Sequence, residues 1–136
     1  MKPSTELQRP NIKTELPGPK SREIIDADAR YVTPSYPRPD YKLVVDHAQG
    51  VWVTDPDGNL FLDCNAGVAV CSTGHCHPEV VAAITKQVNE FIHFCGTDYF
   101  YRQMPELGKM LEDIVPIEGP TRTHFANSGA EAVECA

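Results

Sequence analysis

The sequence is poor in basic side chains and contains no long apolar run. Its 136 residues hold 12 Lys and Arg against 19 Asp and Glu, which gives a net charge of −7 at pH 7. A general nucleic-acid binder needs clustered Lys and Arg for phosphate contacts, so this class is excluded. No stretch is apolar enough to cross a bilayer, so no membrane partner is expected. The composition indicates an acidic soluble domain, or a piece of one.

A secretory signal pattern is also missing, because Met1 and Lys2 are followed by polar residues and proline instead of an apolar segment. The sequence therefore predicts a cytoplasmic protein. An odd number of cysteines in such a chain favours reduced thiols over disulfides. The five cysteines are Cys64, Cys71, Cys76, Cys95 and Cys135.

The sequence also lacks a paired set of zinc ligands. Cys and His side chains gather between residues 71 and 77, but no second ligand pair follows at the spacing of structural zinc sites. We therefore expect no metal. His77 precedes a proline that suits the start of a helix, so we expect it to cap or pack at that helix end.

Proline concentrates at the beginning of the chain, where seven of the 12 prolines lie before residue 40. Each fixes φ and lacks an N–H, so residues 1–40 are predicted to be an extended arm. Within the arm, Ser21 to Arg30 predicts a short helix with Ser21 as its cap. The alternative for residues 1–20 is a disordered tail.

Three short apolar runs follow the arm, at residues 42–46, 51–54 and 60–63. They are rich in β-branched and aromatic side chains and predict strands. The segment Asp55-Pro56-Asp57-Gly58-Asn59 is a strong turn signal, because the proline presets φ and the glycine accepts positive φ. The sequence thus predicts a small antiparallel meander, in which Trp52 packs instead of stacking on a ligand.

Residues 64–78 are rich in small side chains and lack helical periodicity, and small residues allow backbone to approach backbone or a ligand closely. From Pro78 onward, apolar residues recur at steps of three and four and predict an amphipathic helix over 78–94. A weaker pattern predicts a second helix over 105–114, with Gly108 inside it.

Near the C-terminal end, residues 121–127 predict a strand, and a small-residue turn and a helix start follow at once. The unpaired N–H groups of a first helical turn make an anion site, and a phosphate would fit there. The alternative is a plain capping box between Ser128 and Glu131. The turn matches neither G-x-G-x-x-G nor the P-loop, so dinucleotide and nucleoside triphosphate binding lack support.

Several of these motifs together resemble class III aminotransferases, of the 4-aminobutyrate, acetylornithine and ornithine aminotransferase group. The resemblance covers about residues 40–136. It rests on the order of five segments: Asp57-Gly58-Asn59, Phe61-Leu62-Asp63, Ala66-Gly67-Val68-Ala69-Val70, Gly74 to Val81, and Asn127 to Glu134.

The resemblance implies an α/β protein of the PLP-dependent transferase type I fold. It implies a small-domain part over 41–98 and the start of the large cofactor-binding domain over 99–136. Ser128, Gly129 and Ala130 match the loop that binds the phosphate of pyridoxal 5′-phosphate (PLP). Ala130 stands where many relatives have Thr or Ser.

The resemblance also implies a substrate site and a homodimer. Val68 falls where family members place a residue against the substrate side chain. Thr97 falls near the segment that dimers contribute toward the partner's site. The implied reaction moves an amino group from an amino acid, with an ω-amine donor expected, to a 2-oxo acid.

The lysine that forms the Schiff base in this family has no counterpart here, because all six lysines precede the loop at Ser128. We therefore expect an N-terminal fragment that is inactive by itself and contains no catalytic residue. Two alternatives remain open. One is a racemase or decarboxylating lyase of the same fold, and the other is a complete non-catalytic module that binds an anion or a partner.

Overall fold

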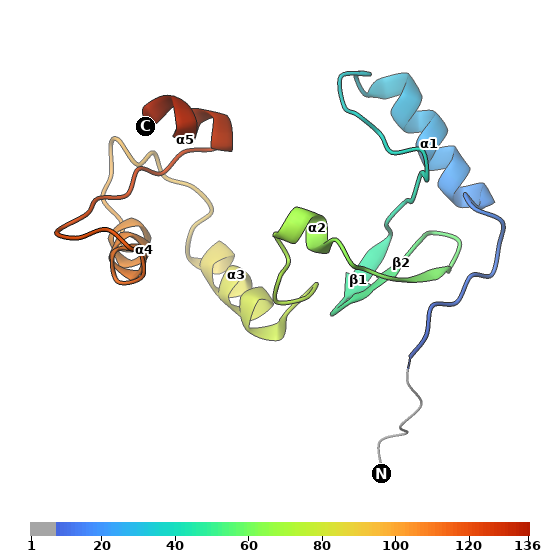
Figure 1. Ribbon diagram of the computed structural model, residues 1–136, viewed down its shortest axis with the longest axis horizontal. Helices are drawn as coiled ribbons and strands as arrows, with labels where there is room; N and C mark the ends of the chain where they lie inside the picture. The colour runs from blue at the N-terminus through green and yellow to red at the C-terminus, as the bar shows by residue number, and fades with distance from the viewer. Residues whose placement is uncertain (1–7) are drawn as a thin grey trace, which may run out of the picture. The chain divides into compact units, whose positions relative to one another are not determined.

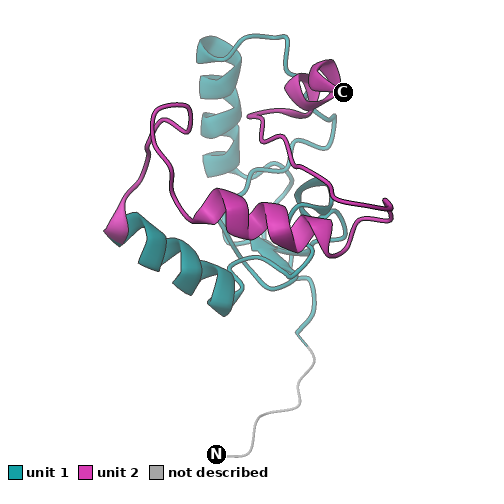
Figure 2. Ribbon diagram, turned by 90° about the vertical axis from the view of Figure 1, so that its left-hand side faces the viewer, with its two compact units in different colours: residues 1–89 teal, residues 90–136 magenta. Residues whose placement is uncertain are grey.

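The computed structural model describes residues 8–136. The chain divides into two compact units, residues 1–89 and 90–136, which Figure 2 colours separately. The part of the predicted arm that precedes residue 8 lies outside the described residues. The predicted division into 1–40, 41–98 and 99–136 stays a prediction.

The first unit contains a three-stranded antiparallel sheet. Its strands are β1 (His47–Gln49), β2 (Trp52–Thr54) and β3 (Leu60–Leu62), in the order β1-β2-β3 (Figure 1). The predicted meander is confirmed. Its second turn forms as expected, with Gly58 at φ +82° and the Asp55 N–H donating to the Asn59 carbonyl at 3.1 Å.

The position predicted for the first strand is wrong. Residues 42–46 are not a strand, and pairing begins with His47 opposite Thr54. The cause is the tight turn at Gly50, whose φ of +58° lets the chain reverse within two residues. Because the turn is so short, the residues just before Gly50 face β2, and the apolar run 42–46 lies beyond the end of β2.

The predicted arm helix is α1 (Pro19–Tyr31), but its cap differs from the expectation. Gly18 is the N-cap residue and Pro19 opens the helix, where a missing N–H costs nothing. Ser21 is buried inside the first turn, and its hydroxyl donates to Asp57 Oδ2 at 2.7 Å. Ser21 therefore joins α1 to the β2–β3 turn and does not cap the helix.

The disordered-tail alternative is wrong for the described part of the arm. Asn11 pairs with Leu60 through two backbone hydrogen bonds of 2.9 Å each. Asn59 Oδ1 accepts the N–H groups of Lys13 at 2.6 Å and Thr14 at 3.1 Å. The arm thus runs along β3 and is fixed to the turn that precedes it.

The buried side chains of the described residues lie at or near the β2–β3 turn. Val53 is the one buried apolar side chain among residues 8–136, at 6% exposure. Three buried polar residues lie at the turn or on α1: Ser21, Asp55 and Asn59. Buried polar groups require hydrogen-bond partners, and all three have them.

Four further helices follow: α2 (Ala66–Ala69), α3 (Pro78–Glu90), α4 (Gln103–Glu112) and α5 (Gly129–Cys135). The two predicted amphipathic helices are confirmed, although α3 ends four residues before the predicted 94. The apolar stripe of α3 is exposed at Val80, Ile84 and Val88.

Two differences concern the remaining segments. The strand predicted over 121–127 is wrong, because the described chain offers that segment no strand to pair with. The turn at α2 was not predicted. Among the described residues, no helix is both long and apolar enough to span a membrane.

Candidate functional site

The segment after β3 contains one left-handed turn. Ala66, Gly67, Val68 and Ala69 have φ of +50°, +63°, +59° and +62°. A left-handed conformation costs a residue with a Cβ roughly 1–2 kcal/mol, and it is especially rare for a β-branched one such as Val68. Neighbouring groups must therefore hold this turn in place. The Val68 side chain lies on it at the surface, and the residue is 81% exposed.

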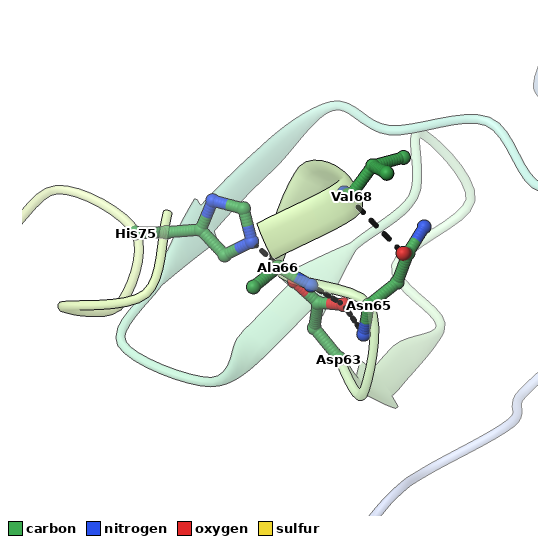
Figure 3. A network of polar contacts seen from close by, with 5 residues as sticks. All are labelled: Asp63, Asn65, Ala66, Val68 and His75. Atoms are coloured by element: carbon green, nitrogen blue, oxygen red, sulfur yellow. Dashed lines mark hydrogen bonds and ion pairs between the residues drawn. The ribbon is translucent and has the colours of Figure 1, made fainter. Parts of the chain in front are cut away.

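Asp63 provides the main support (Figure 3). Its Oδ1 accepts the N–H of Asn65 at 2.7 Å and that of Ala66 at 2.9 Å. The side chain of Asn65 in turn accepts the Val68 N–H at 3.3 Å. The first N–H groups of the turn are thereby satisfied by side-chain oxygens, as at the start of an ordinary helix.

The second oxygen of Asp63 lies 2.6 Å from His75 Nε2. This pair is largely shielded, with side-chain exposures of 13% for Asp63 and 22% for His75. The N–H of Asn65, followed by His75 and the N–H of Ala66, lowers the pKa of the Asp63 carboxyl from its ordinary value. Asp63 is therefore a stable anion at neutral pH.

Both members of the pair are fixed to the β1–β2 turn. His75 and Gly50 exchange two backbone hydrogen bonds, of 2.8 and 2.9 Å. The Asp63 N–H donates to the Val51 carbonyl at 2.8 Å. Gly74 allows this approach, because a Cβ there would lie 3.2 Å from Gly50 Cα. The tip of the sheet thus anchors the left-handed turn.

The metal interpretation gains no support from this region. No group of three or more His, Cys, Asp and Glu side chains in the described chain could hold a metal ion. His75, which belongs to the Cys and His cluster of the sequence, already pairs with Asp63 through its Nε2. The His77 carbonyl accepts the Val81 N–H at 3.0 Å, so His77 stands at the start of α3 as predicted.

The predicted phosphate loop lies at the start of α5 in the second unit. Ser128 is the N-cap, with extended φ and ψ, and its Oγ accepts the Glu131 N–H at 3.2 Å. Glu131 Oε2 accepts the Asn127 N–H at 2.7 Å. The capping alternative is therefore realised in part: Ser128 caps the helix, but the Glu131 carboxylate binds the N–H of Asn127 instead of that of Ser128.

This cap leaves room for a ligand. In the described chain the N–H groups of Gly129 and Ala130 have no hydrogen-bond partner. No heavy atom lies within 4 Å of a Cβ built on Gly129, so the backbone is open there. The Ser128 hydroxyl keeps its proton to donate while its oxygen accepts. The residues therefore fit a phosphate group.

Thr97 lies in an exposed turn of the second unit. Its hydroxyl lies 3.0 Å from Cys95 Sγ and 3.4 Å from Asp98 Oδ1. The hydroxyl and the N–H of Thr97 are the main groups that lower the pKa of the Cys95 thiol. Within the described residues, no hydrogen bond joins Thr97 to the loop at Ser128.

The sequence did not indicate Asp63, Asn65 and His75 as parts of the site around Val68. One local signal was present, because an Asp followed by Asn two residues later is typical of side-chain-capped turns. The pairing of Asp63 with His75 carries no such signal. It depends on the sheet, which brings residues 12 positions apart into contact.

Comparison with known proteins agrees with the motifs. The model of the family described as "Aminotransferase class-III" matches residues 35–136. An acetylornithine aminotransferase of Methanothermobacter thermautotrophicus is 43% identical over 84% of this chain. A 4-aminobutyrate aminotransferase of Mycobacterium tuberculosis is 38% identical over 93% of it. An isoleucine 2-epimerase of Lentilactobacillus buchneri is 36% identical over 83%.

The chain spans about a quarter of the length of these relatives, at 28%, 28% and 25%.

Solved structures give the same fold. An ornithine aminotransferase of Toxoplasma gondii, with PLP described at its active site, matches 85% of this chain and 26% of its own, with a TM-score of 0.72 and 30% identity. An N-acetylornithine aminotransferase of Stenotrophomonas maltophilia matches 82% of this chain and 28% of its own, with a TM-score of 0.66 and 34% identity. The fold is thus that of the PLP-dependent aminotransferases, and the chain belongs to the class III aminotransferase family.

Proposed function

We propose that this chain is the N-terminal part of a PLP-dependent aminotransferase that moves an amino group from an amino acid to a 2-oxo acid. The family match over residues 35–136 carries the proposal. The chain's length, at 28% of the acetylornithine aminotransferase relative, supports its being one part of a larger enzyme. The exposed apolar stripe of α3 is the kind of surface that further sequence would cover.

The cofactor phosphate is proposed to bind at Ser128, Gly129 and Ala130. The two free N–H groups point to an anion, and the Ser128 hydroxyl can donate while it caps α5. Ala130 contributes only its N–H, because it has no hydroxyl. These contacts would fix one end of the cofactor and leave its ring to groups outside this chain.

When bound, PLP supplies an electron sink that lets bonds at the substrate's amino carbon break. The lysine that would hold the cofactor covalently is proposed to lie outside these 136 residues, so the chain alone would not transaminate. Within the chain, Val68 would contact the substrate side chain. Thr97 would lie toward the partner's site in a homodimer.

Membership of the family also suggests the domain bounds, the amino donor and the location of the protein. The arm would occupy 1–40, the small domain 41–98 and the beginning of the large domain 99–136. An ω-amine donor is supported by the relatives named for acetylornithine and 4-aminobutyrate. A cytoplasmic location is supported by the five free cysteines, which suit a reducing compartment.

Epimerisation is the second candidate. It is favoured by the isoleucine 2-epimerase of Lentilactobacillus buchneri, which is 36% identical to this chain. The same electron sink serves both reactions, so the chain's own residues do not separate them. Incubation of the full-length protein with L-isoleucine in D₂O, without a 2-oxo acid, separates them: an epimerase yields deuterated D-alloisoleucine, and an aminotransferase gives no epimer.

Cofactor binding tests the proposal at the level of residues. The full-length protein is titrated with PLP by equilibrium dialysis, and Ser128→Ala is compared with Ser35→Ala, which removes an exposed hydroxyl from the segment after α1. We expect tight binding by the wild type and by Ser35→Ala, and weaker binding by Ser128→Ala. A wild-type protein that does not bind PLP would refute the proposal.

A further inference from the structure

The left-handed turn at Ala66–Ala69 is an unfavourable conformation that a network of side chains maintains. Three of its four residues carry a Cβ, and all four have positive φ. Such strain persists only where the surroundings over-determine it. The groups that hold the turn therefore also determine the position of Val68.

The network runs in an unbroken line from the sheet to Val68. Gly50 holds the His75 backbone through two hydrogen bonds, and the His75 ring holds Asp63 Oδ2 at 2.6 Å. Asp63 Oδ1 binds the N–H groups that open the turn, and Asn65 Oδ1 binds the Val68 N–H at 3.3 Å.

The Val68 side chain takes no part in this network. Figure 3 shows it pointing away from the Asp63–His75 pair, and the residue is 81% exposed. An apolar side chain held outward on a strained turn gains nothing from packing in the described chain. The proposed function places this side chain against the substrate, so the groups that fix the turn would also fix that contact.

We propose that Asp63 and His75 are positioning residues that set the enzyme's preference for the length and shape of the substrate side chain by holding Val68 in the left-handed turn. This inference rests on the proposed aminotransferase function. Neither residue contacts substrate itself. Each acts through the backbone of residues 65–68, so its loss would affect which donor binds well more than how fast the bound donor reacts.

The test uses the full-length protein loaded with PLP. Asp63→Asn removes the charge of the pair, and His75→Phe removes its ring nitrogens. Asp46→Asn is the matched control, because it removes the charge of the Asp46–His47 pair of 2.8 Å, in which both side chains are exposed. Values of kcat and KM are measured for 4-aminobutyrate, ornithine and N-acetylornithine.

We expect the ratio of kcat/KM between the best and the worst donor to change by about tenfold in both variants, mainly through KM. The control should keep the wild-type ratio within about twofold. His75→Gln can still donate a hydrogen bond to Asp63 and should recover part of the selectivity. Unchanged donor ratios in Asp63→Asn and His75→Phe would overturn the proposal.

Crystal structures of the same variants provide the second measurement. The proposal requires that φ at Val68 leaves the positive range whenever donor preference changes. A lost turn with unchanged preference overturns the positioning role and leaves the aminotransferase function standing. A full-length wild type that transfers no amino group overturns both.

One further variant keeps the test usable if the pair variants do not fold. Asn65→Ala removes only the side-chain acceptor of the Val68 N–H, from an exposed position. A shift in donor ratio in the same direction supports the proposal, and a wild-type ratio contradicts it.

Discussion

Replacing Asn59 with alanine should release residues 13–14 of the arm from the β2–β3 turn and destabilise the fold. Asn59 is fully buried, and its side chain uses all of its hydrogen-bonding capacity. Oδ1 accepts from the N–H groups of Lys13 and Thr14 at 2.6 and 3.1 Å. Nδ2 donates to Thr14 Oγ1 at 2.9 Å and to Asp55 Oδ2 at 2.7 Å. One side chain thus fixes residues 13–14 to the β2–β3 turn.

The expected loss follows from these four bonds. A hydrogen bond contributes about 1 kcal/mol net to stability, so the variant should lose roughly 4 kcal/mol if no group finds a new partner. Water can reach the Lys13 and Thr14 N–H groups once the arm lifts, which lowers the figure to about 2–3 kcal/mol. Against a typical unfolding free energy of about 5–15 kcal/mol, this is a large effect.

The assay is urea unfolding followed by the fluorescence of Trp52, the one tryptophan of the chain, which lies on β2. Asn89→Ala is the matched control, because Asn89 is exposed and its side chain makes a single bond, to the Thr85 carbonyl. The control should change the unfolding free energy by less than about 0.5 kcal/mol. An Asn59→Ala value equally close to the wild type would refute the proposed anchoring of the arm.

Three further predictions concern Asp63, Thr97 and Ala130. Because hydrogen bonds lower the pKa of Asp63 below 3.8, its carboxylate stabilises the fold above this pH, and the contribution is lost as pH falls through the lowered value. Asp63→Asn should thus be less stable than the wild type at pH 7 and match it in strong acid. Urea midpoints measured across pH test this, and a constant difference would contradict it. The Thr97→Val variant loses the hydroxyl that lowers the pKa of Cys95, so iodoacetamide should alkylate Cys95 more slowly at pH 7.5, by peptide mass spectrometry with Cys135 as internal reference. An unchanged rate would contradict this assignment. Ala130→Ser adds a donor to the proposed phosphate site, and a hydrogen bond to a charged group contributes roughly 1.5–3 kcal/mol. PLP should bind the full-length variant at least about tenfold more tightly by equilibrium dialysis, whereas Ala132→Ser, deeper in α5, should match the wild type.

Features encoded by a few adjacent residues were predictable. The turn at Asp55–Asn59 forms because Pro56 and Gly58 determine it locally. Helices α3 and α4 follow the apolar periodicity of their own sequences. The cap at Ser128 likewise needs only a serine before a helix start.

Features that depend on distant partners were not predictable. The apolar run 42–46 has better strand composition than His47–Gln49, but the turn at Gly50 decides which residues face β2. Serine is a residue type typical of N-caps, yet Ser21 lies buried within α1, where its hydroxyl donates to Asp57, which lies far along the chain. The left-handed turn at Val68 contradicts local preference and exists because the sheet brings Asp63 and His75 together.

Transfer of ¹⁵N tests the central claim most directly. The full-length protein, loaded with PLP, is incubated with 2-oxoglutarate and with ¹⁵N-labelled 4-aminobutyrate or N-acetylornithine, and glutamate is analysed by mass spectrometry. The aminotransferase proposal predicts ¹⁵N-glutamate that depends on both PLP and the donor. A protein that binds PLP but yields no labelled glutamate from either donor, or from ornithine, would contradict it.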